Sequence, residues 1–331
     1  MVLLAIETSC DDTAAAVIEN GIPRSNIVSS QYVHNQFGGV VPEMASREHQ
    51  KNIIHVAHTA LKASGFALKD LNAIAFTRGP GLPGSLMVGA SFAKGLALAL
   101  NIPLISVHHM EAHILSLLIG EHCPTFPFLC LVVSGGHTLL VLVRAWNSME
   151  VLGTTKDDSV GEAFDKCAKI LGLGYPGGKL IDDLAKNGDS DAFSFPVARI
   201  PGYDFSYSGV KTAFLYFVQS KESAWLEAQK PHICASIQKA LLRPLLDKLK
   251  QAIRETGIRC IGLAGGVAAN SSLRWQLAEM GKEMGCDVFV PDFQYCTDNA
   301  GMIGRAAVFK YEQAAFSELS ITTEPRLKIG S

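Results

Sequence analysis

The chain has 331 residues, of which 48% are hydrophobic and 18% are charged. This length predicts two domains, and this composition is typical of a well-packed globular enzyme, so it excludes a disordered or fibrous chain. The formal net charge of −2 offers nucleic acid no general attraction, so RNA binding would require a local patch or a second subunit.

Cysteine usage and hydropathy indicate a reduced, aqueous location. The eight cysteines form no Cys-x-x-Cys pair, and a chain with a core of this size does not need disulfide bonds. Residues 1–6 are a short apolar strand with no charged leader before it. The apolar stretch 86–105 is interrupted by Lys94 and Pro103 before it reaches membrane-spanning length. We therefore expect a cytoplasmic protein with no membrane association.

A strand–turn–strand pattern opens the chain at residues 2–18 and returns at residues 128–143. In both copies, two apolar runs flank a short turn that is rich in Ser, Thr or Gly. The repeat predicts an internal duplication of one α/β unit.

Between the two copies, the spacing of apolar residues predicts a helix over residues 49–64, a strand over 73–77 and a long helix over 86–100. The loop before the long helix is rich in Gly and Pro and ends in Ser85. Backbone amides at such a helix start can bind an anion.

A short strand, residues 103–107, leads into two histidines that we expect on one helix face. In a helix, His109 and His113 project from the same side, at a spacing that lets two imidazoles bind a single metal ion. Zinc peptidases of the His-Glu-x-x-His type need Glu directly after the first His, and Met110 occupies that position here. The pattern therefore predicts a ligand pair without the peptidase base.

The second half of the chain is mainly helical from about residue 159 to 256. The expected helices are residues 161–171, residues 180–187, and one or two long helices within residues 225–255. Between the first two lies a Gly-rich loop, residues 172–178. Pro231 and Pro244 should bend the long helical segment.

Strand–loop–helix order returns over residues 260–290, with Gly265 and Gly266 in a turn that lets a ligand approach the backbone. The polar run 297–299 opens a final helix, with Asp298 near its N-terminus. One carboxylate added to two imidazoles makes a three-ligand site with open positions, as in catalytic metal centres. Asp298 is therefore the expected third ligand.

Nine short runs spread over most of the chain are similar to one known family. They are residues 6–13, 41–49, 79–86, 108–113, 133–138, 161–166, 175–178, 264–270 and 297–300. Together they resemble the tRNA threonylcarbamoyladenosine transferases, called TsaD in bacteria, and the chain looks like the bacterial type.

The resemblance implies an α/β fold of the actin-like and sugar-kinase-like (ASKHA) class, with two duplicated lobes. The N-terminal lobe would comprise residues 1–107, joined by the C-terminal segment of about 311–331. The second lobe would comprise residues 108–310, with a helical insertion at about 159–256.

The resemblance also implies a reaction. These enzymes transfer the threonylcarbamoyl group of threonylcarbamoyl-adenylate to the N6 amine of the adenosine next to the tRNA anticodon, and AMP is released. Bacterial members work with a paralogous inactive subunit (TsaB-type) and a small ATPase (TsaE-type).

Site residues follow from the matching motifs. His109, His113 and Asp298 would bind one divalent metal per subunit, most often Fe²⁺, with Zn²⁺ as the alternative. The positions that would hold the adenylate are Val132, Val133, Ser134, Gly135, Gly136, Asp165, Gly178, Asp182 and Asn270. The amine of adenosine is a weak nucleophile, and the candidate bases that could assist it are Asp11 and Asp12.

Two other functions are open alternatives: an ATP-dependent small-molecule kinase of the same fold, and a non-catalytic scaffold subunit. Kinases of this fold usually open with Asp-x-Gly-Thr and hold Mg²⁺ with carboxylates. Here Glu7 stands first, no Gly follows it, and the candidate ligands are imidazoles. The presence of all three ligand positions argues against a scaffold.

Overall fold

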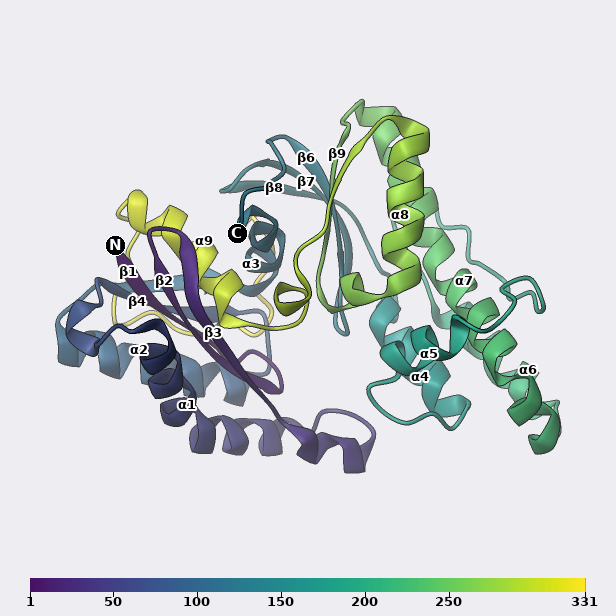
Figure 1. The fold of residues 1–331 in the computed structure, drawn as a ribbon, viewed down its shortest axis with the longest axis horizontal. Helices are drawn as coiled ribbons and strands as arrows, with labels where there is room; N and C mark the ends of the chain where they lie inside the picture. The colour runs from purple at the N-terminus through teal and green to yellow at the C-terminus, as the bar shows by residue number, and fades with distance from the viewer. Residues whose placement is uncertain (331) are drawn as a thin grey trace. The chain divides into compact units, whose positions relative to one another are not determined.

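The computed structural model describes residues 1–330, without the side chains of Asn35 and Gln36. The chain divides into two compact units, each with its own sheet (Figure 1). The first unit comprises Met1–Cys123, Trp146–Ser148 and Pro291–Ser331, and the second comprises Pro124–Ala145 and Met149–Val290.

These boundaries differ from those expected from sequence, 107/108 and 310/311. The first unit also contains α3 (His109–Leu115) and α9 (Ala300–Glu312). The cause is packing, because α9 contacts every strand of the first sheet and α3 packs against α9. The helix α3, which contains His109 and His113, and the helix α9, which follows Asp298, therefore belong to one compact unit.

The first sheet has the strand order β3-β2-β1-β4-β5. Its strands are β1 (Val2–Glu7), β2 (Asp12–Glu19), β3 (Ile22–Ser30), β4 (Ala73–Gly79) and β5 (Leu104–His108). The first three strands pair in antiparallel fashion, whereas β4 and β5 continue from β1 in parallel. The strand β3 was not expected from the sequence, because its mixed polar residues lie at the half-exposed edge of the sheet.

Two helices, α1 (Pro42–Ser64) and α2 (Pro83–Leu100), pack on one face of this sheet, and α9 packs on the other (Figure 1). Burial of the apolar residues of α1 and α2 against β1 and β4 forms the core on that face of the sheet. On the α9 side, the approach is so close that a Cβ atom at Gly304 would lie 2.2 Å from Ile18 Cγ1.

Among the described residues, α2 is the one helix long and apolar enough to cross a membrane. Its residues Ala90, Ala93 and Ala97 are instead buried in the core of the first unit. Burial thus accounts for the apolar residues on the inner face of α2, whereas Met87 and Leu98 on its outer side are exposed.

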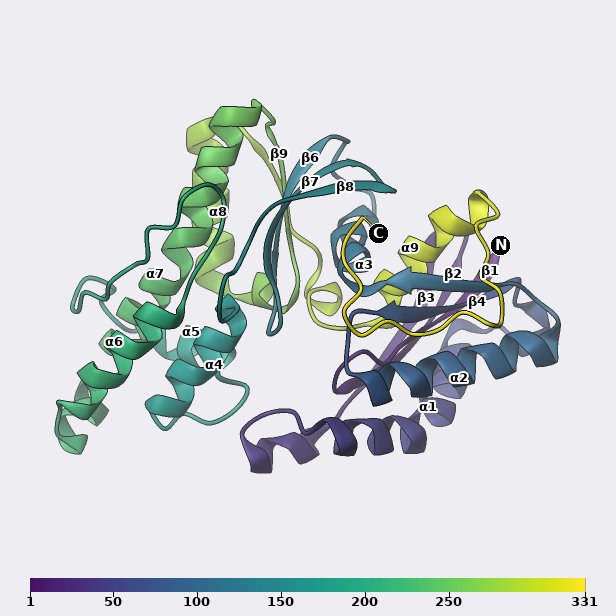
Figure 2. The same ribbon diagram turned by 180° about the vertical axis from the view of Figure 1, so that it is seen from behind.

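The C-terminal segment runs across the first unit beside β5 (Figure 2). The amide of Ser317 donates to the carbonyl of Leu104 (2.8 Å), and Glu324 pairs with Arg78 (3.0 Å). The amide of Gly330 donates to Glu111 Oε1 on α3 (3.2 Å).

The second sheet has the order β10-β9-β6-β7-β8. Its strands are β6 (Phe128–Val133), β7 (Thr138–Ala145), β8 (Ser148–Thr154), β9 (Cys260–Ala264) and β10 (Asp287–Phe289). As in the first sheet, an antiparallel hairpin is continued on its other side by two parallel strands. The two sheets thus share one strand order, and the predicted duplication of an α/β unit is confirmed.

Five helices complete the second unit: α4 (Val160–Ile170), α5 (Gly177–Ala185), α6 (Ser208–Gln219), α7 (Ser223–Thr256) and α8 (Ser271–Met284). The segment expected as one or two long helices is the single helix α7, which contains both Pro231 and Pro244. Gly177 and Gly178, expected in a loop, are the first residues of α5, because Pro176 provides the extended residue that precedes a helix.

Candidate functional site

The two histidines and Asp298 meet within the first unit. His109 and His113 lie one turn apart on α3, with ring centroids 4.7 Å apart. Asp298 reaches them from the loop before α9, and its Oδ1 lies 3.1 Å from His113 Nε2 and 3.4 Å from His109 Nε2. Both imidazoles are buried, whereas 23% of the Asp298 side chain is exposed.

This geometry suits a metal ion. Two ligand atoms that are each about 2.0–2.2 Å from one ion lie roughly 3 to 3.5 Å apart, which matches the two separations from Asp298 Oδ1, and the ligand atoms of all three residues lie within 4.8 Å of one another. Across the described residues, these three form the single group of His, Cys, Asp or Glu side chains whose ligand atoms converge in this way. Two imidazoles and one carboxylate form a donor set that several first-row divalent metals accept.

A buried carboxylate that was not among the expected site residues completes the cluster. The Oε2 atom of Glu7, the last residue of β1, lies 3.1 Å from His109 Nδ1. Glu7 also accepts hydrogen bonds from the Thr77 hydroxyl and the Ser9 amide. The sequence signal available for Glu7 was a charged residue that directly follows five apolar ones in a buried strand.

The charges of the cluster depend on one another. Burial raises the pKa of Asp298, but the imidazoles of His109 and His113 outweigh burial and hold that pKa well below its usual range. Burial lowers the pKa of His109, yet Glu7 and Asp298 together raise it to about 10. The cluster therefore attracts positive charge, whether a proton or a metal ion.

The two candidate bases lie where the turn after β1 leads into β2: Asp11 is in the turn, and Asp12 is the first residue of β2. Burial raises the pKa of Asp12 to about 7, and the charges of Asp298 and Asp11 add to this effect. The turn is anchored from both helices, since His49 Nε2 of α1 (2.9 Å) and Ser85 Oγ of α2 (3.2 Å) donate to the carbonyl of Cys10. Asp12 is thus held in place and titrates near neutral pH.

In the second unit, the equivalent hairpin turn carries the first group of adenylate candidates. Val132 and Val133 are fully buried at the end of β6, and Ser134 opens the turn. Ser134 Oγ accepts from the amides of Gly136 (3.3 Å) and His137 (3.1 Å). The turn is therefore compact, and its glycines Gly135 and Gly136 leave the space next to it open.

Asp165 and Gly178 lie where α4 meets α5. Asp165 Oδ1 accepts from the amide of Gly177 (2.7 Å) at the start of α5. A Cβ atom at Gly177 would lie 2.2 Å from the Cβ of Ala168, whereas one at Gly178 would meet nothing nearer than 3.8 Å. Of the two glycines, Gly178 is the one beside open space.

Asp182 and Asn270 hold the start of α8. Asp182 accepts from the amide and the hydroxyl of Ser271, both at 2.9 Å. Asn270 Oδ1 caps the helix by accepting from Leu273 N (2.9 Å), and its Nδ2 donates to Gln238 Oε1 (2.8 Å). These capping roles were not predicted from the sequence.

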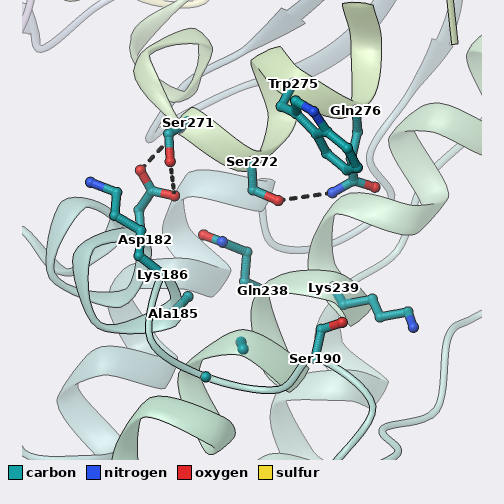
Figure 3. Close-up of a pocket in the computed structure, with 12 residues that line it drawn as sticks. Asp182, Ala185, Lys186, Ser190, Gln238, Lys239, Ser271, Ser272, Trp275 and Gln276 are labelled. Carbon is teal, nitrogen blue, oxygen red and sulfur yellow. Dashed lines mark hydrogen bonds between the residues drawn. The ribbon is translucent and has the colours of Figure 1, made fainter. Parts of the chain in front are cut away.

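Beside this helix start lies a pocket of about 350 Å³ (Figure 3). Asp182, Lys186, Gln238 and Trp275 are among the side chains that line it. Trp275 lies at its rim and is 66% exposed, which is unusual for so large an apolar group. The pocket thus offers hydrogen-bond acceptors, a cation and an aromatic face.

The whole chain can be compared with known proteins. A family described as tRNA N6-adenosine threonylcarbamoyltransferase matches residues 24–305. The protein of that name from Christiangramia forsetii is 55% identical, with 98% of each chain covered, and the one from Cytophaga hutchinsonii is 52% identical, with 99% of this chain and 96% of the relative covered. The chain belongs to this family.

More distant solved structures share the fold of this threonylcarbamoyltransferase family member. Full-length HypF, in its phosphate- and nucleotide-bound form, superposes with a TM-score of 0.63 at 15% identity, covering 96% of this chain and 56% of HypF. Component A of the Acidaminococcus fermentans (R)-2-hydroxyglutaryl-CoA dehydratase superposes with a TM-score of 0.56 at 14% identity, covering 95% and 99%. The predicted two-lobe α/β fold of the ASKHA class is confirmed.

Proposed function

We propose that the protein transfers the threonylcarbamoyl group of threonylcarbamoyl-adenylate to the N6 amine of the adenosine next to the tRNA anticodon, with release of AMP. Full-length relatives at 47–55% identity carry the name of this activity. The convergence of His109, His113 and Asp298 is the observation that supports it most, because neither a kinase nor a scaffold requires that donor set.

His109, His113 and Asp298 would hold one divalent metal, with Fe²⁺ as the first candidate and Zn²⁺ as the second. When bound, such an ion polarises a carbonyl oxygen and neutralises charge that develops during acyl transfer. The described residues supply three donors, two buried imidazoles and one carboxylate, so a bound ion would have positions left for substrate.

The adenylate would be held by Val132, Val133, Ser134, Gly135, Gly136, Asp165, Gly178, Asp182 and Asn270 of the second unit. The glycines let the phosphate approach the backbone of the turn after β6. Asp182 keeps free lone pairs beside its bonds to Ser271, so it can also accept from a ribose hydroxyl. Because the acyl group arrives activated, positioning accounts for much of the expected catalysis.

Asp12 is the proposed acceptor of the proton that the adenosine amine loses. A carboxylate with a pKa of about 7 is balanced between its two forms at physiological pH, which suits a general base. Asp11 is the alternative, since it directly precedes Asp12.

We further propose a cytoplasmic location and two protein partners, a paralogous TsaB-type subunit and a small TsaE-type ATPase. Free thiols at all eight cysteines agree with a reducing compartment. For the paralogous subunit, the outer side of α2 is a candidate surface, because Met87 and Leu98 are 60% and 67% exposed there.

Incorporation of radiolabelled threonine into unmodified tRNA tests the reaction. The mixture contains ATP, bicarbonate, an adenylate-forming enzyme and the two partner subunits, with wild type compared with His109→Ala. His55→Ala, which removes an exposed histidine of α1, is the matched control.

Label with wild type and His55→Ala, and none with His109→Ala, would support both the transferase and its metal site. Label with all three proteins would leave the transferase and remove His109 from the mechanism. No label with wild type, in a mixture that is active with another family member, would favour the scaffold. Consumption of ATP by the purified protein alone, without the adenylate-forming enzyme and without either partner subunit, would favour the kinase.

A further inference from the structure

Glu7 is a fully buried carboxylate that the proposed reaction does not use directly. A buried carboxylate is tolerated only where donors or opposite charges surround it. Three donors meet Glu7: the Ser9 amide at Oε1, and the Thr77 hydroxyl and His109 Nδ1 at Oε2. Each comes from a different segment, so the position of Glu7 is fixed from several sides.

The contacts of His109 determine which of its ring nitrogens carries hydrogen. Nδ1 faces two oxygens, Glu7 Oε2 at 3.1 Å and Ser9 Oγ at 3.2 Å. The Ser9 hydroxyl can donate or accept, whereas an ionised carboxylate can only accept a hydrogen bond, so Glu7 decides. Nδ1 therefore carries the hydrogen of the neutral ring. Nε2, which faces Asp298 Oδ1 at 3.4 Å, is left with the lone pair that a metal needs.

We infer that Glu7 is a positioning residue of the metal centre, which holds His109 as the Nδ1–H tautomer and aims Nε2 at the ion. The inference rests on the proposed metal site. Charge balance supports it as well: with the ion bound, both imidazoles are neutral, Glu7 and Asp298 carry two negative charges, and one divalent ion balances them. Compensation of this kind matters most in a buried site.

The substitution Glu7→Gln preserves size and removes this function. With its amide nitrogen at the Oε2 position, Gln would present a donor to His109 Nδ1, which favours the tautomer with hydrogen on Nε2. In the opposite orientation, the amide nitrogen would face the Ser9 N–H, a backbone donor that cannot rotate away. The first orientation therefore removes the tautomer that the metal needs, and the second leaves a donor against a donor.

The experiment measures the zinc affinity of purified full-length protein by competition with a chromophoric chelator. We expect Glu7→Gln to bind zinc about 10- to 100-fold more weakly than wild type, the usual loss when the outer partner of a metal-bound histidine is removed. Glu111→Gln is the matched control, because it makes the same change on α3, between the two histidines, at a carboxylate bonded to Gly330. We expect it to stay within about threefold of wild type.

Equal zinc affinity of Glu7→Gln and wild type, with unchanged circular dichroism, would overturn the inference. An equal loss of zinc affinity in Glu111→Gln would also overturn it, since removal of any nearby negative charge would then explain the weaker binding. Equal zinc affinity of wild type and His109→Ala would show that the metal site itself is absent. That result would contradict the proposed metal site, on which the inference rests, rather than the role of Glu7 alone.

A second measurement needs no variant at Glu7. In ¹⁵N-histidine-labelled, zinc-loaded wild type, long-range ¹H–¹⁵N correlation spectra distinguish the two tautomers of each ring. The His109 signals are assigned by their loss in His109→Asn. Hydrogen on Nδ1 is expected, and hydrogen on Nε2 would contradict the inference even if Glu7→Gln fails to fold.

Discussion

Alanine at Gly177 should destabilise the protein, whereas alanine at Gly178 should weaken nucleotide binding without destabilising it. A Cβ atom at Gly177 would lie 2.2 Å from the Cβ of Ala168, so α5 would have to move away from α4 by roughly 1 Å. Overpacking of this kind costs about 1–3 kcal/mol. For a domain of this size, each kcal/mol lowers the unfolding temperature by about 2–4 °C, so a fall of about 2–12 °C is expected.

Gly178 lies in a different environment, one residue further along α5. Its added Cβ would meet nothing nearer than Phe164 Cβ at 3.8 Å, and Ala is the better helix former. The unfolding temperature should therefore stay the same or rise slightly. The methyl group would project into the open space assigned to the adenylate, so we expect AMP affinity to fall by about tenfold.

Scanning calorimetry and isothermal titration with AMP separate the two effects. An unfolding temperature of Gly177→Ala within about 1 °C of wild type would refute the close approach of α4 and α5. Wild-type AMP affinity in Gly178→Ala would remove Gly178 from the nucleotide site. The two variants serve as controls for each other, because the chemical change is the same.

Three further predictions concern Asp12, Trp275 and Asn270. The transfer rate should rise with pH through about 7, as burial holds the pKa of Asp12 there, and Asp12→Asn should lose this rise in a pH–rate profile. Because that pKa lies above the unfolded-state value of 3.8, folding stability falls as pH rises from about 4 to about 7 and stays low above 7, so Asp12→Asn should unfold at a higher temperature than wild type at pH 8. Because Asp182, an adenylate candidate, lines the pocket that also contains Trp275, AMP should change the fluorescence of Trp275, and an AMP-induced change of the same size in Trp275→Phe would show that Trp275 does not report on the nucleotide. Asn270→Ala should lose about 1–2 kcal/mol in urea unfolding, since it removes the cap of α8 and a partner of Gln238, whereas Asn270→Ser should keep most of the stability.

The sequence indicated the three residues that converge at the candidate metal site, because their signal is local. Two histidines four residues apart share a helix face in any helix, and a polar run before a helix places Asp298 at its start. Glu7 has no such signal, since its role depends on β5 and α3 bringing His109 beside the end of β1. Strand pairing between distant segments is not encoded in any one of them.

The lobe boundaries and the long helix show the same limit. The position of α9 follows from close packing on the first sheet, where Gly304 lies against Ile18, and this packing is not visible in a hydropathy pattern. Pro231 and Pro244 suggested bends or a break, yet α7 continues through both. Its largely buried central segment compensates for the backbone hydrogen bonds that prolines remove.

The shared strand order of the two sheets places Glu7 and Val133 at equivalent positions, each the last residue of the first hairpin strand of its unit. The residues that follow differ in charge: Asp11 and Asp12 come after β1, whereas Gly135 and Gly136 come after β6. Equivalent places on two copies of one scaffold thus carry opposite preferences, the acidic copy for positive charge and the glycine-rich copy, with its exposed backbone amides, for negative charge.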